Sequence, residues 1–414
     1  MDLSAAPPVR KRGGFTDLAP YALIIAAVLL AWQIVSQPVV QRAPVEIAVR
    51  IAPGSHMVLR RAAEAELIAG RPDNAGALAR DALARAPFDV RALRVVGLTE
   101  ARAGREVEAD DILTLAGNWS LRDDPAHAWL LDYRLRRGDY ASSFAHADTL
   151  VRRREDIRPA IFNMFTTAAI HDRQRALPVI AALVAARPPW RQNYLDSLYT
   201  SPDGLQTAAG LVVLLQSSRA PLTNVELRQF YLQFLDKGQV EAVRTVQARL
   251  NRPPVSDNVT NGGFGEPAPP EPFQWRLAQN AGVVVEIVPD DIRPGNPALR
   301  VDYDGFSATQ IVEQLMFLSP GPRRLTLEAR VEAGDPAARL AWTMTCTPGD
   351  RKIMSAPATP RAAREWTVHR IDFAIPADCP AQWLRLEALG GDRHDQTTAW
   401  LDRVAIVTVR PVPE

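Results

Sequence analysis

The most constraining feature of this sequence is a 34-residue period in its first half. Gly70, Gly104 and Gly138 follow one another at intervals of 34 residues, and Gly204 and Gly238 are separated by the same interval. Each glycine lies between two amphipathic, helix-favouring stretches, as the turn of a helical hairpin requires. Such a hairpin cannot bury its apolar face alone, so successive units must stack. The period therefore predicts a solenoid of about six helical hairpins.

The first two units also resemble tetratricopeptide repeats. Small residues stand at the family's close-packing positions in both units: Ala63, Ala75 and Ala82, then Gly97, Ala109 and Ala116. Pro87 closes the first unit, whereas Leu121 stands in the equivalent place of the second. The later units keep the period and lose most of the small residues. The resemblance implies a helical repeat domain over residues 57–252 that binds a protein partner on its concave surface.

Arginine is the dominant exposed charge expected on that concave surface. The candidates for a partner groove are Arg134, Arg136, Arg137, Arg152, Arg153 and Arg154. One interpretation is a cationic groove that receives an acidic segment or a polysaccharide. The alternative is an ordinary solvated helix face.

The N-terminal region contains an uncharged stretch from Leu18 to Gln41. Its length is sufficient to cross a bilayer, and Arg10, Lys11 and Arg12 precede it. We therefore expect residues 1–17 in the cytoplasm, a transmembrane anchor over residues 18–40 and a linker over residues 41–56. In a bacterium this is a single-pass inner-membrane protein whose bulk lies in the periplasm. A cleaved signal peptide and a buried core helix are the alternatives.

The pattern changes at Asn251-Arg-Pro-Pro254, where the helical periodicity gives way to strands. Residues 324–332 alternate cleanly between apolar and polar side chains, which is typical of a half-buried strand. About nine such strands, separated by Gly/Pro turns, predict an antiparallel β-sandwich of the jelly-roll type over residues 256–414. The expected fold class is thus multidomain α+β: an anchor helix, an α-solenoid and a sandwich.

The order of motifs in this region resembles the galactose-binding-type jelly rolls, especially the family 4/9-like carbohydrate-binding modules. The motifs are Asn261-Gly-Gly-Phe264, Trp275, the run Pro297 to Gly305, Phe317-Leu-Ser-Pro-Gly321 and Ala399-Trp-Leu-Asp402. The resemblance implies sugar sites built on aromatic platforms, for which the candidates are Trp275, Tyr303, Trp366, Trp383 and Trp400. It also implies a structural calcium site. Asp402 matches the position of one calcium ligand of the family, whereas Glu266 lies one residue after the position of the other.

The chain has two cysteines, Cys346 and Cys379. In an oxidising compartment an even number of cysteines favours pairing, so we expect a disulfide within the sandwich. Two separate buried thiols are the alternative.

The domain boundary near Asn251–Asp257 raises the question of how the solenoid ends. The two prolines in this segment cannot continue the last helix. Because solenoid ends expose apolar surface unless capped, we expect the sandwich to pack on the last hairpin, around Val240–Leu250. A flexible tether is the alternative.

Composition and motifs exclude several functions. The 48 basic and 47 acidic residues leave a net charge of +1, which argues against a nucleic-acid binder. No catalytic motif or convergent constellation is evident, so we expect no enzyme and no cofactor beyond structural calcium. The favoured hypothesis is an envelope scaffold for exopolysaccharide assembly or export, with protein and glycan partners. The alternatives are an assembly factor without sugar affinity and a cryptic glycan-processing enzyme.

Overall fold

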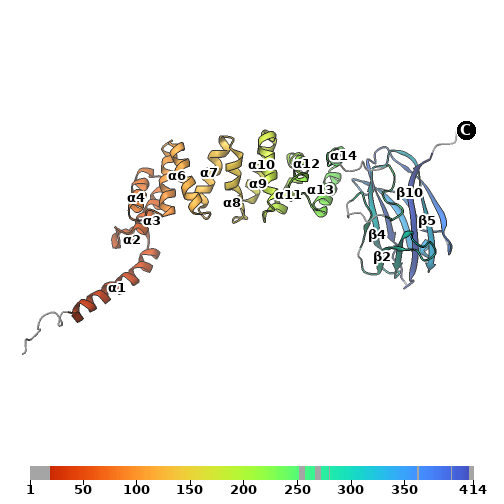
Figure 1. Ribbon diagram of the computed structural model, residues 1–414, viewed down its shortest axis with the longest axis horizontal. Coiled ribbons are helices and arrows are strands. Elements are labelled where there is room, and N and C mark those ends of the chain that lie inside the picture. The colour runs from red at the N-terminus through yellow and green to blue at the C-terminus, as the bar shows by residue number, and fades with distance from the viewer. Residues whose placement is uncertain are drawn as a thin grey trace, which may run out of the picture. The chain divides into compact units, whose positions relative to one another are not determined.

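The computed structural model describes residues 19–250, 257–265, 272–278, 280–360, 363–392 and 394–409 (Figure 1). The class is α+β, as predicted: helices form the N-terminal part, and two antiparallel sheets form the C-terminal part. The chain divides into two compact units, Met1–Glu155 and Asp156–Glu414, called here the N-terminal and C-terminal units.

The N-terminal unit is helical in its described part. Its helices are α1 (Ala19–Arg42), α2 (Val45–Ile51), α3 (His56–Ile68), α4 (Pro72–Arg85), α5 (Val90–Arg102), α6 (Glu106–Trp119), α7 (Asp124–Arg136) and α8 (Tyr140–Val151). From α3 onward they form successive hairpins, in agreement with the predicted period.

The periodic glycines explain where the first helix of each hairpin ends. Gly70, Gly104 and Gly138 have φ values of 75°, 79° and 70°, in the left-handed region that favours glycine. At Gly70 the amide bonds to the Leu67 carbonyl, and the next amide bonds to the Glu66 carbonyl. The same pair of bonds recurs at the other two glycines. Each is a Schellman motif, which satisfies the last carbonyls of the helix and reverses the chain.

Small residues allow the paired helices to approach closely, as the sequence predicted. Ala63, Ala75, Ala109 and Ala116 are fully buried. A Cβ added at Gly97 would lie 2.6 Å from Cγ of Leu113. Side-chain volume at these positions would force the helices of a hairpin apart.

The helices of the C-terminal unit are α9 (Arg158–His171), α10 (Arg173–Ala185), α11 (Arg191–Leu198), α12 (Pro202–Gln216), α13 (Asn224–Asp236) and α14 (Val240–Arg249). Gly238 closes α13 with the predicted Schellman motif at φ 70°. Gly204 is different, because it lies inside α12. A Cβ there would meet the Leu198 carbonyl oxygen at 2.2 Å. Gly204 therefore permits a close backbone approach and is not a hairpin turn.

Helix α1 covers most of the predicted anchor. Its described side chains include exposed apolar residues such as Leu23, Ile24 and Ile25. Residues 1–18 and the side chains of residues 33–40 lie outside the described part. Within the described residues, no helix is both long and apolar enough to traverse a bilayer. The anchor and its orientation stay predictions.

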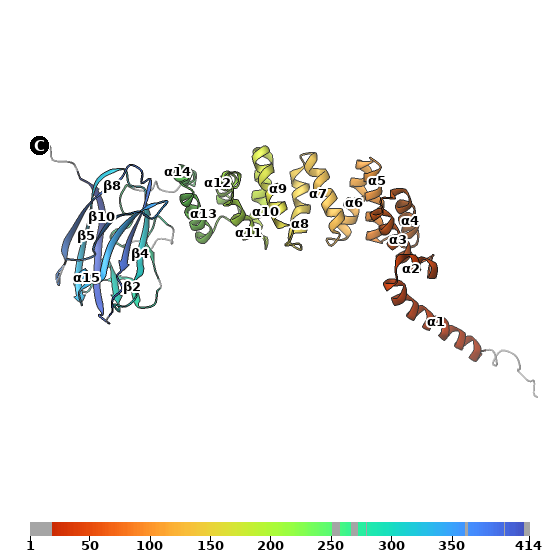
Figure 2. The ribbon, with the colours of Figure 1, turned by 180° about the vertical axis from the view of Figure 1, so that it is seen from behind.

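The sandwich consists of two five-stranded antiparallel sheets (Figures 1 and 2). The first sheet has the order β1-β4-β9-β6-β7, with strands β1 (Arg276–Leu277), β4 (Thr309–Met316), β9 (Ala381–Ala388), β6 (Leu340–Thr347) and β7 (Lys352–Pro357). The second has the order β2-β3-β10-β5-β8, with strands β2 (Val283–Pro289), β3 (Pro297–Tyr303), β10 (Thr397–Thr408), β5 (Gly321–Ala333) and β8 (Thr367–Ile375). A single helical turn, α15 (Pro336–Arg339), precedes β6.

The sandwich core follows the predicted alternation. On β5, Leu325, Leu327, Ala329 and Val331 are at most 1% exposed, whereas the intervening polar residues lie on the outer face. Strand β7 was missed by the sequence prediction, which expected about nine strands where the described sandwich has ten, and β1 is only two residues long.

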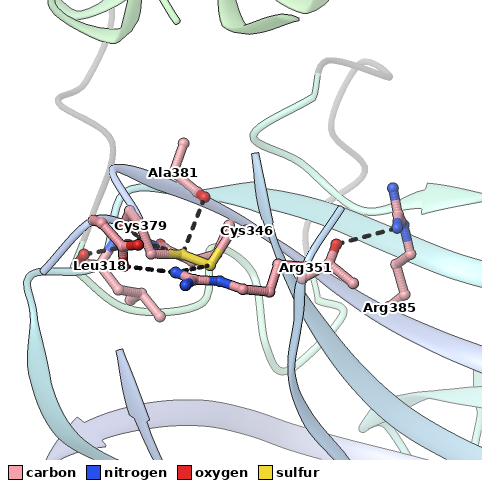
Figure 3. The surroundings of a disulfide bond; sticks show 9 residues. Leu318, Cys346, Arg351, Cys379, Ala381 and Arg385 are labelled. Atoms are coloured by element: carbon pink, nitrogen blue, oxygen red, sulfur yellow. Dashed lines mark hydrogen bonds and ion pairs between the residues drawn. A yellow bond between two sulfur atoms is a disulfide. The ribbon is translucent and has the colours of Figure 1, made fainter. Parts of the chain in front are cut away.

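The predicted disulfide is present (Figure 3). Cys346 of β6 and Cys379, in the turn before β9, are bonded, and their Cα atoms lie 5.3 Å apart. Gln382 holds the same turn, because its side-chain amide donates to the Cys379 carbonyl and accepts from the Leu318 amide. The disulfide therefore ties β6 to a turn that is already hydrogen-bonded to the end of β4.

Within the C-terminal unit, the sandwich contacts the last helical hairpin. The ring of Tyr231 on α13 meets Phe273 edge-on at 5.1 Å, and Phe273 packs on Phe317 at 5.3 Å. The Arg244 guanidinium of α14 lies 4.7 Å from the Phe317 ring centre. The expected packing is thus found, although α13 contributes as well as the predicted range Val240–Leu250. These contacts hold α13 beside the outer face of the first sheet.

Candidate functional site

A cleft of about 450 Å³ lies between α13 and the outer face of the first sheet. Helix α13 contributes one wall, and strands β1, β4 and β9 contribute the floor. The turn between β6 and β7 forms the rim. The lining residues that carry charge or a ring are Arg228, Asp236, Arg276, Glu313, Asp350, Trp383 and Arg385.

Glu313 is the centre of this cleft. Its side chain is 5% exposed and forms ion pairs with three guanidinium groups. The nitrogen-to-oxygen distances are 2.5 Å for Arg276, 3.1 Å for Arg228 and 3.4 Å for Arg385. Strand register explains two of them, because Arg276 of β1 and Arg385 of β9 lie directly opposite Glu313 on its two neighbouring strands. Arg228 comes from α13. A buried carboxylate thus gathers three cations that are far apart in sequence.

The centre of the cleft carries more positive than negative charge. Burial, and then the neighbouring Arg276, lower the pKa of Arg228. Nε of Arg228 is buried and has no hydrogen-bond partner among the described residues. Asp350, 3.6 Å from Arg385, stands at the rim with a side chain that is 76% exposed. Guanidinium groups arranged in this way can donate charge-assisted hydrogen bonds to a carboxylate or to hydroxyl groups.

Trp383 is the predicted aromatic residue that the structure brings into the cleft. It lies next to Arg385 on β9, and the Arg385 guanidinium is 5.4 Å from the Trp383 ring centre. The indole is 7% exposed and lines the cavity. The cleft therefore combines an aromatic ring with hydrogen-bond donors.

Two other predicted platforms lie in the sandwich core. Trp275 is 6% exposed, stacks on Phe264 and donates to the Asn261 carbonyl. Tyr303 is 1% exposed, and its hydroxyl lies within hydrogen-bond distance of two acceptors, the Ser307 and Leu389 carbonyl oxygens. Both rings are occupied by packing, which is the common role of aromatic residues in a sandwich.

The remaining two platforms, Trp366 and Trp400, belong to a ladder on the outer side of the second sheet. Cations and rings alternate there in the order Arg300, Trp400, Arg330, Trp366 and Arg293, with separations of 4.6–6.0 Å. Carboxylates balance the ladder. Asp290 pairs with Arg330 and accepts from Trp366, and Glu332 accepts from Trp400. Trp400 is 4% exposed, so little of its ring can meet a ligand.

The predicted calcium residues are placed only in part. Asp402 is buried at 1% exposure and accepts hydrogen bonds from the Asn296 side chain and the Arg403 amide, both at 2.7 Å. Glu266 lies outside the described residues. In the part of the chain that the structure describes, no group of three acidic, histidine or cysteine side chains could hold a metal ion. Calcium binding stays a prediction.

The arginines of the predicted partner groove lie in the N-terminal unit, where carboxylates surround them. Arg134 pairs with Asp110, and Arg136 pairs with Glu106. The other pairs are Arg136 with Asp132, Arg152 with Asp148, Arg153 with Asp124 and Arg154 with Asp124. Arg137 lies 5.5 Å from the Tyr133 ring centre. An acidic partner at this surface would have to compete with these internal pairs.

Arg134 also ends a chain of hydrogen bonds through two histidines. Its Nη1 lies 3.2 Å from Nε2 of His146, whose Nδ1 lies 2.9 Å from Nδ1 of His127. Nε2 of His127 lies 3.3 Å from the Ser120 carbonyl oxygen. Since arginine can only donate, each imidazole must donate onward, and this direction requires both histidines to be neutral. Burial lowers the pKa of His127, and burial followed by the His127 charge lowers the pKa of His146 to about 4.

We expect this histidine pair to make the N-terminal unit acid-sensitive. When the pH falls below about 6.5, the pKa of histidine in the unfolded chain, the two histidines become protonated in the unfolded state but stay neutral in the folded state. Stability should therefore be full above about pH 6.5 and fall as the pH approaches 4. The measurement is the urea midpoint as a function of pH. His146→Gln should flatten this dependence, whereas His56→Gln, in the same unit, should preserve it. Parallel curves for the two variants would contradict the expectation.

Sequence reasoning missed the charged members of the cleft. Glu313 and Arg228 are 85 residues apart in the chain. One local signal was present: Glu313 lies within a run of buried residues, from Ile311 to Met316, in β4. A charged residue at such a position requires a partner, but the sequence does not show which one.

Comparisons with known proteins give a limited result. No protein-family profile matches the chain, and no curated protein matches it. The tetratricopeptide assignment of the helical hairpins is therefore not confirmed.

Known structures do match about a third of the chain, and several of them are carbohydrate-binding modules. A CBM4 module is 15% identical, covers 36% of this chain and 97% of its own length, and has a TM-score of 0.28. The xylan-binding CBM22-1 domain from Paenibacillus barcinonensis is 12% identical, with coverages of 33% and 87% and a TM-score of 0.25. A family 11 module from Clostridium thermocellum, in complex with a β-1,3-1,4-mixed-linked tetrasaccharide, is 12% identical, with coverages of 36% and 95% and a TM-score of 0.25. Likeness at this level does not establish what the present chain binds.

Proposed function

We propose that the C-terminal unit binds an acidic glycan in the cleft beside α13, and that the chain is a non-enzymatic scaffold. The observation that supports this most is the cluster of Arg228, Arg276 and Arg385 around the buried Glu313, next to Trp383. Glu313, together with Asp350 beside Arg385 at the rim, still leaves donor capacity on the three guanidinium groups. A ligand that carries carboxylates and hydroxyls is the chemical match.

The cleft offers two complementary contacts to such a sugar. A uronic acid carboxylate accepts hydrogen bonds from the guanidinium groups that line the cleft. The apolar face of the sugar ring packs against Trp383, which lines the same cavity.

The wider role is an envelope scaffold. The stacked helical hairpins offer a surface for a protein partner, as solenoids generally do. The disulfide supports an oxidising compartment, which agrees with a periplasmic location behind the predicted N-terminal anchor. A protein that holds both a glycan and a partner protein suits the assembly or export of an exopolysaccharide.

The test is affinity electrophoresis of the full chain in gels that contain a polyuronate or, for comparison, a neutral glucan. We expect the polyuronate to retard the chain and the neutral glucan to have little effect. Arg228→Met should weaken retardation roughly tenfold, because one charge-assisted contact is lost. Arg370→Met, an exposed arginine on β8, is the matched control and should leave retardation unchanged. Equal mobility of the native chain in all gels would contradict glycan binding and favour an assembly factor without sugar affinity.

A further inference from the structure

The C-terminal unit has a second and larger cleft, among its helices. It has a volume of about 960 Å³ and contains no residue of the sandwich. Its lining residues are Arg173, Tyr199, Thr200, Ser201, Pro202, Leu205, Gln206, Ala209, Phe234, Lys237, Gln239, Ala242 and Arg249. They come from α10, from the turn between α11 and α12, and from α12, α13 and α14.

The charge in this cleft is all of one sign. Arg173, Lys237 and Arg249 line it, and none of the other lining residues is acidic. Within the described residues, Arg173 and Arg249 form no ion pair, and all three side chains are exposed. Lys237 approaches its neighbour Asp236 at 3.6 Å, but that carboxylate is 72% exposed and screened by water. This contrasts with Arg134, Arg136 and the run Arg152 to Arg154 in the N-terminal unit, which pair with carboxylates.

Three helices begin at this cleft. Arg173 is the first residue of α10, and Ser201 and Gln239 are the N-caps of α12 and α14. Three helix N-termini therefore contribute residues to one cleft. Each of these N-termini already has a carboxylate at its cap or in its first turn, namely Asp172, Asp203 and Glu241, so the positive field of the cleft comes from its three cations.

Gly210 positions one of the cations. A Cβ added at Gly210 would lie 2.2 Å from Nη2 of Arg173 and 2.7 Å from Leu177. The absence of a side chain therefore lets the Arg173 guanidinium rest on the surface of α12. The cation is held across the neighbouring helix instead of extending freely into solvent.

Part of the wall of the cleft is apolar. Leu205, Ala209 and Ala242 are partly exposed there, and the rings of Tyr199 and Phe234 lie behind them. Burial raises the pKa of Tyr199, so its hydroxyl remains neutral and adds no negative charge. Apolar walls suit the side chains of a peptide, whereas an acidic polysaccharide has carboxylates but no apolar side chains to place against them.

We infer that this cleft binds an acidic peptide segment of a partner protein. Carboxylates of the peptide pair with Arg173, Lys237 and Arg249, and its apolar side chains contact Leu205, Ala209 and Ala242. The inference rests on the proposed scaffold role and adds to it the place and the chemistry of the protein contact.

The test measures fluorescence anisotropy of a labelled synthetic peptide of alternating glutamate and leucine, titrated with the full chain. A peptide with glutamine in place of glutamate is the ligand control. We expect the acidic peptide to bind, with an affinity that falls as salt rises, and the glutamine peptide to bind at least roughly tenfold more weakly.

Charge reversal locates the site. The triple variant Arg173→Glu, Lys237→Glu and Arg249→Glu should reduce peptide affinity at least roughly tenfold. The matched control carries the same change in net charge at exposed arginines elsewhere: Arg85→Glu, Arg122→Glu and Arg370→Glu. It should retain affinity within about twofold at elevated salt, where long-range effects are screened. Gly210→Ala keeps every charge but displaces the Arg173 guanidinium, and should weaken binding by a smaller factor.

Three results would overturn the inference: no binding of the acidic peptide at low ionic strength, equal losses in the two triple variants, or displacement of the bound peptide by the polyuronate. Circular dichroism of each variant distinguishes loss of the site from loss of the fold. Retardation by the polyuronate is measured on the same proteins. It should survive in the variant of Arg173, Lys237 and Arg249 and fall in Arg228→Met, so failure of the peptide site and failure of the glycan site are separable.

Discussion

Replacing Glu313 with glutamine is expected to destabilise the C-terminal unit by about 3–5 kcal/mol. The substitution preserves shape and removes the buried carboxylate that three guanidinium groups share at the centre of the cleft. Arg228, whose pKa is already lowered by burial and by Arg276, would then face Arg276 with no counter-charge between them. Removing one partner of a buried ion cluster costs more than the cluster itself contributes, because the remaining charges stay desolvated. The measurement is urea unfolding of the full chain.

The matched control is Glu387→Gln, on the neighbouring strand β9 of the same sheet. Glu387 is half-buried and forms no ion pair within the described residues, so its replacement should change stability by less than about 0.5 kcal/mol. Adding Arg228→Met to Glu313→Gln should restore part of the loss, because one uncompensated cation is removed. A loss below about 1 kcal/mol for Glu313→Gln alone would show that the cluster is solvated rather than buried.

Removing the disulfide is expected to cost about 3–4 kcal/mol. Cys346 and Cys379 are 33 residues apart, so the bond closes a loop that includes β7 and β8. Without it the unfolded chain gains conformational freedom, which lowers the free energy of unfolding. The measurement compares urea unfolding of the native chain with that of the double variant Cys346→Ala and Cys379→Ala.

Reduction provides the control for the disulfide. The native chain in excess reductant should match the double variant, because both lack the bond and keep the remaining packing. The loss should be confined to the transition of the C-terminal unit, since neither cysteine belongs to the N-terminal unit. Coincident unfolding curves for the native chain, the reduced chain and the variant would contradict the expected contribution.

The helical part was predictable where backbone geometry leaves one option. Gly70, Gly104, Gly138 and Gly238 adopt positive φ values and close Schellman motifs, and few residues other than glycine do so easily. Gly204 shows the limit of the same reasoning. It keeps the spacing, but its function is close contact with the Leu198 carbonyl. The sequence alone does not show whether a glycine is required for a positive φ value or for a close backbone contact.

Strands were predictable from the sequence where one face of the strand is buried and the other face is exposed to solvent. On β5 the alternation of Leu325 and Leu327 with Thr326 and Glu328 identified both the strand and its core face. Strand β7 has a weaker pattern, with one buried residue, Met354, and it was missed. An edge strand has a neighbouring strand on one side only, so fewer of its residues are buried. Its alternation of apolar and polar residues, on which such predictions depend, is therefore weaker.

The candidate site was predictable only in its aromatic component. Among the predicted platforms, Trp383 lines the cleft, whereas Trp275 and Tyr303 are part of the core. A tryptophan in a strand is compatible with either location, since alternation fixes its face but not what covers that face. Glu313 and Arg228 meet only because α13 packs against the first sheet. This contact joins segments that are far apart in the sequence, so no local sequence pattern predicts it.

The position of the cleft limits how this protein can be taken apart or recombined. Arg228 belongs to a helix and Glu313 to a strand of the sandwich, so a transplanted sandwich would carry an incomplete site into its new host. Conversely, exchanging the sandwich for a homologous one would preserve the site only if α13 were exchanged with it. The recombination unit that carries this binding property is therefore larger than the jelly roll, and it begins at or before Asn224, the first residue of α13.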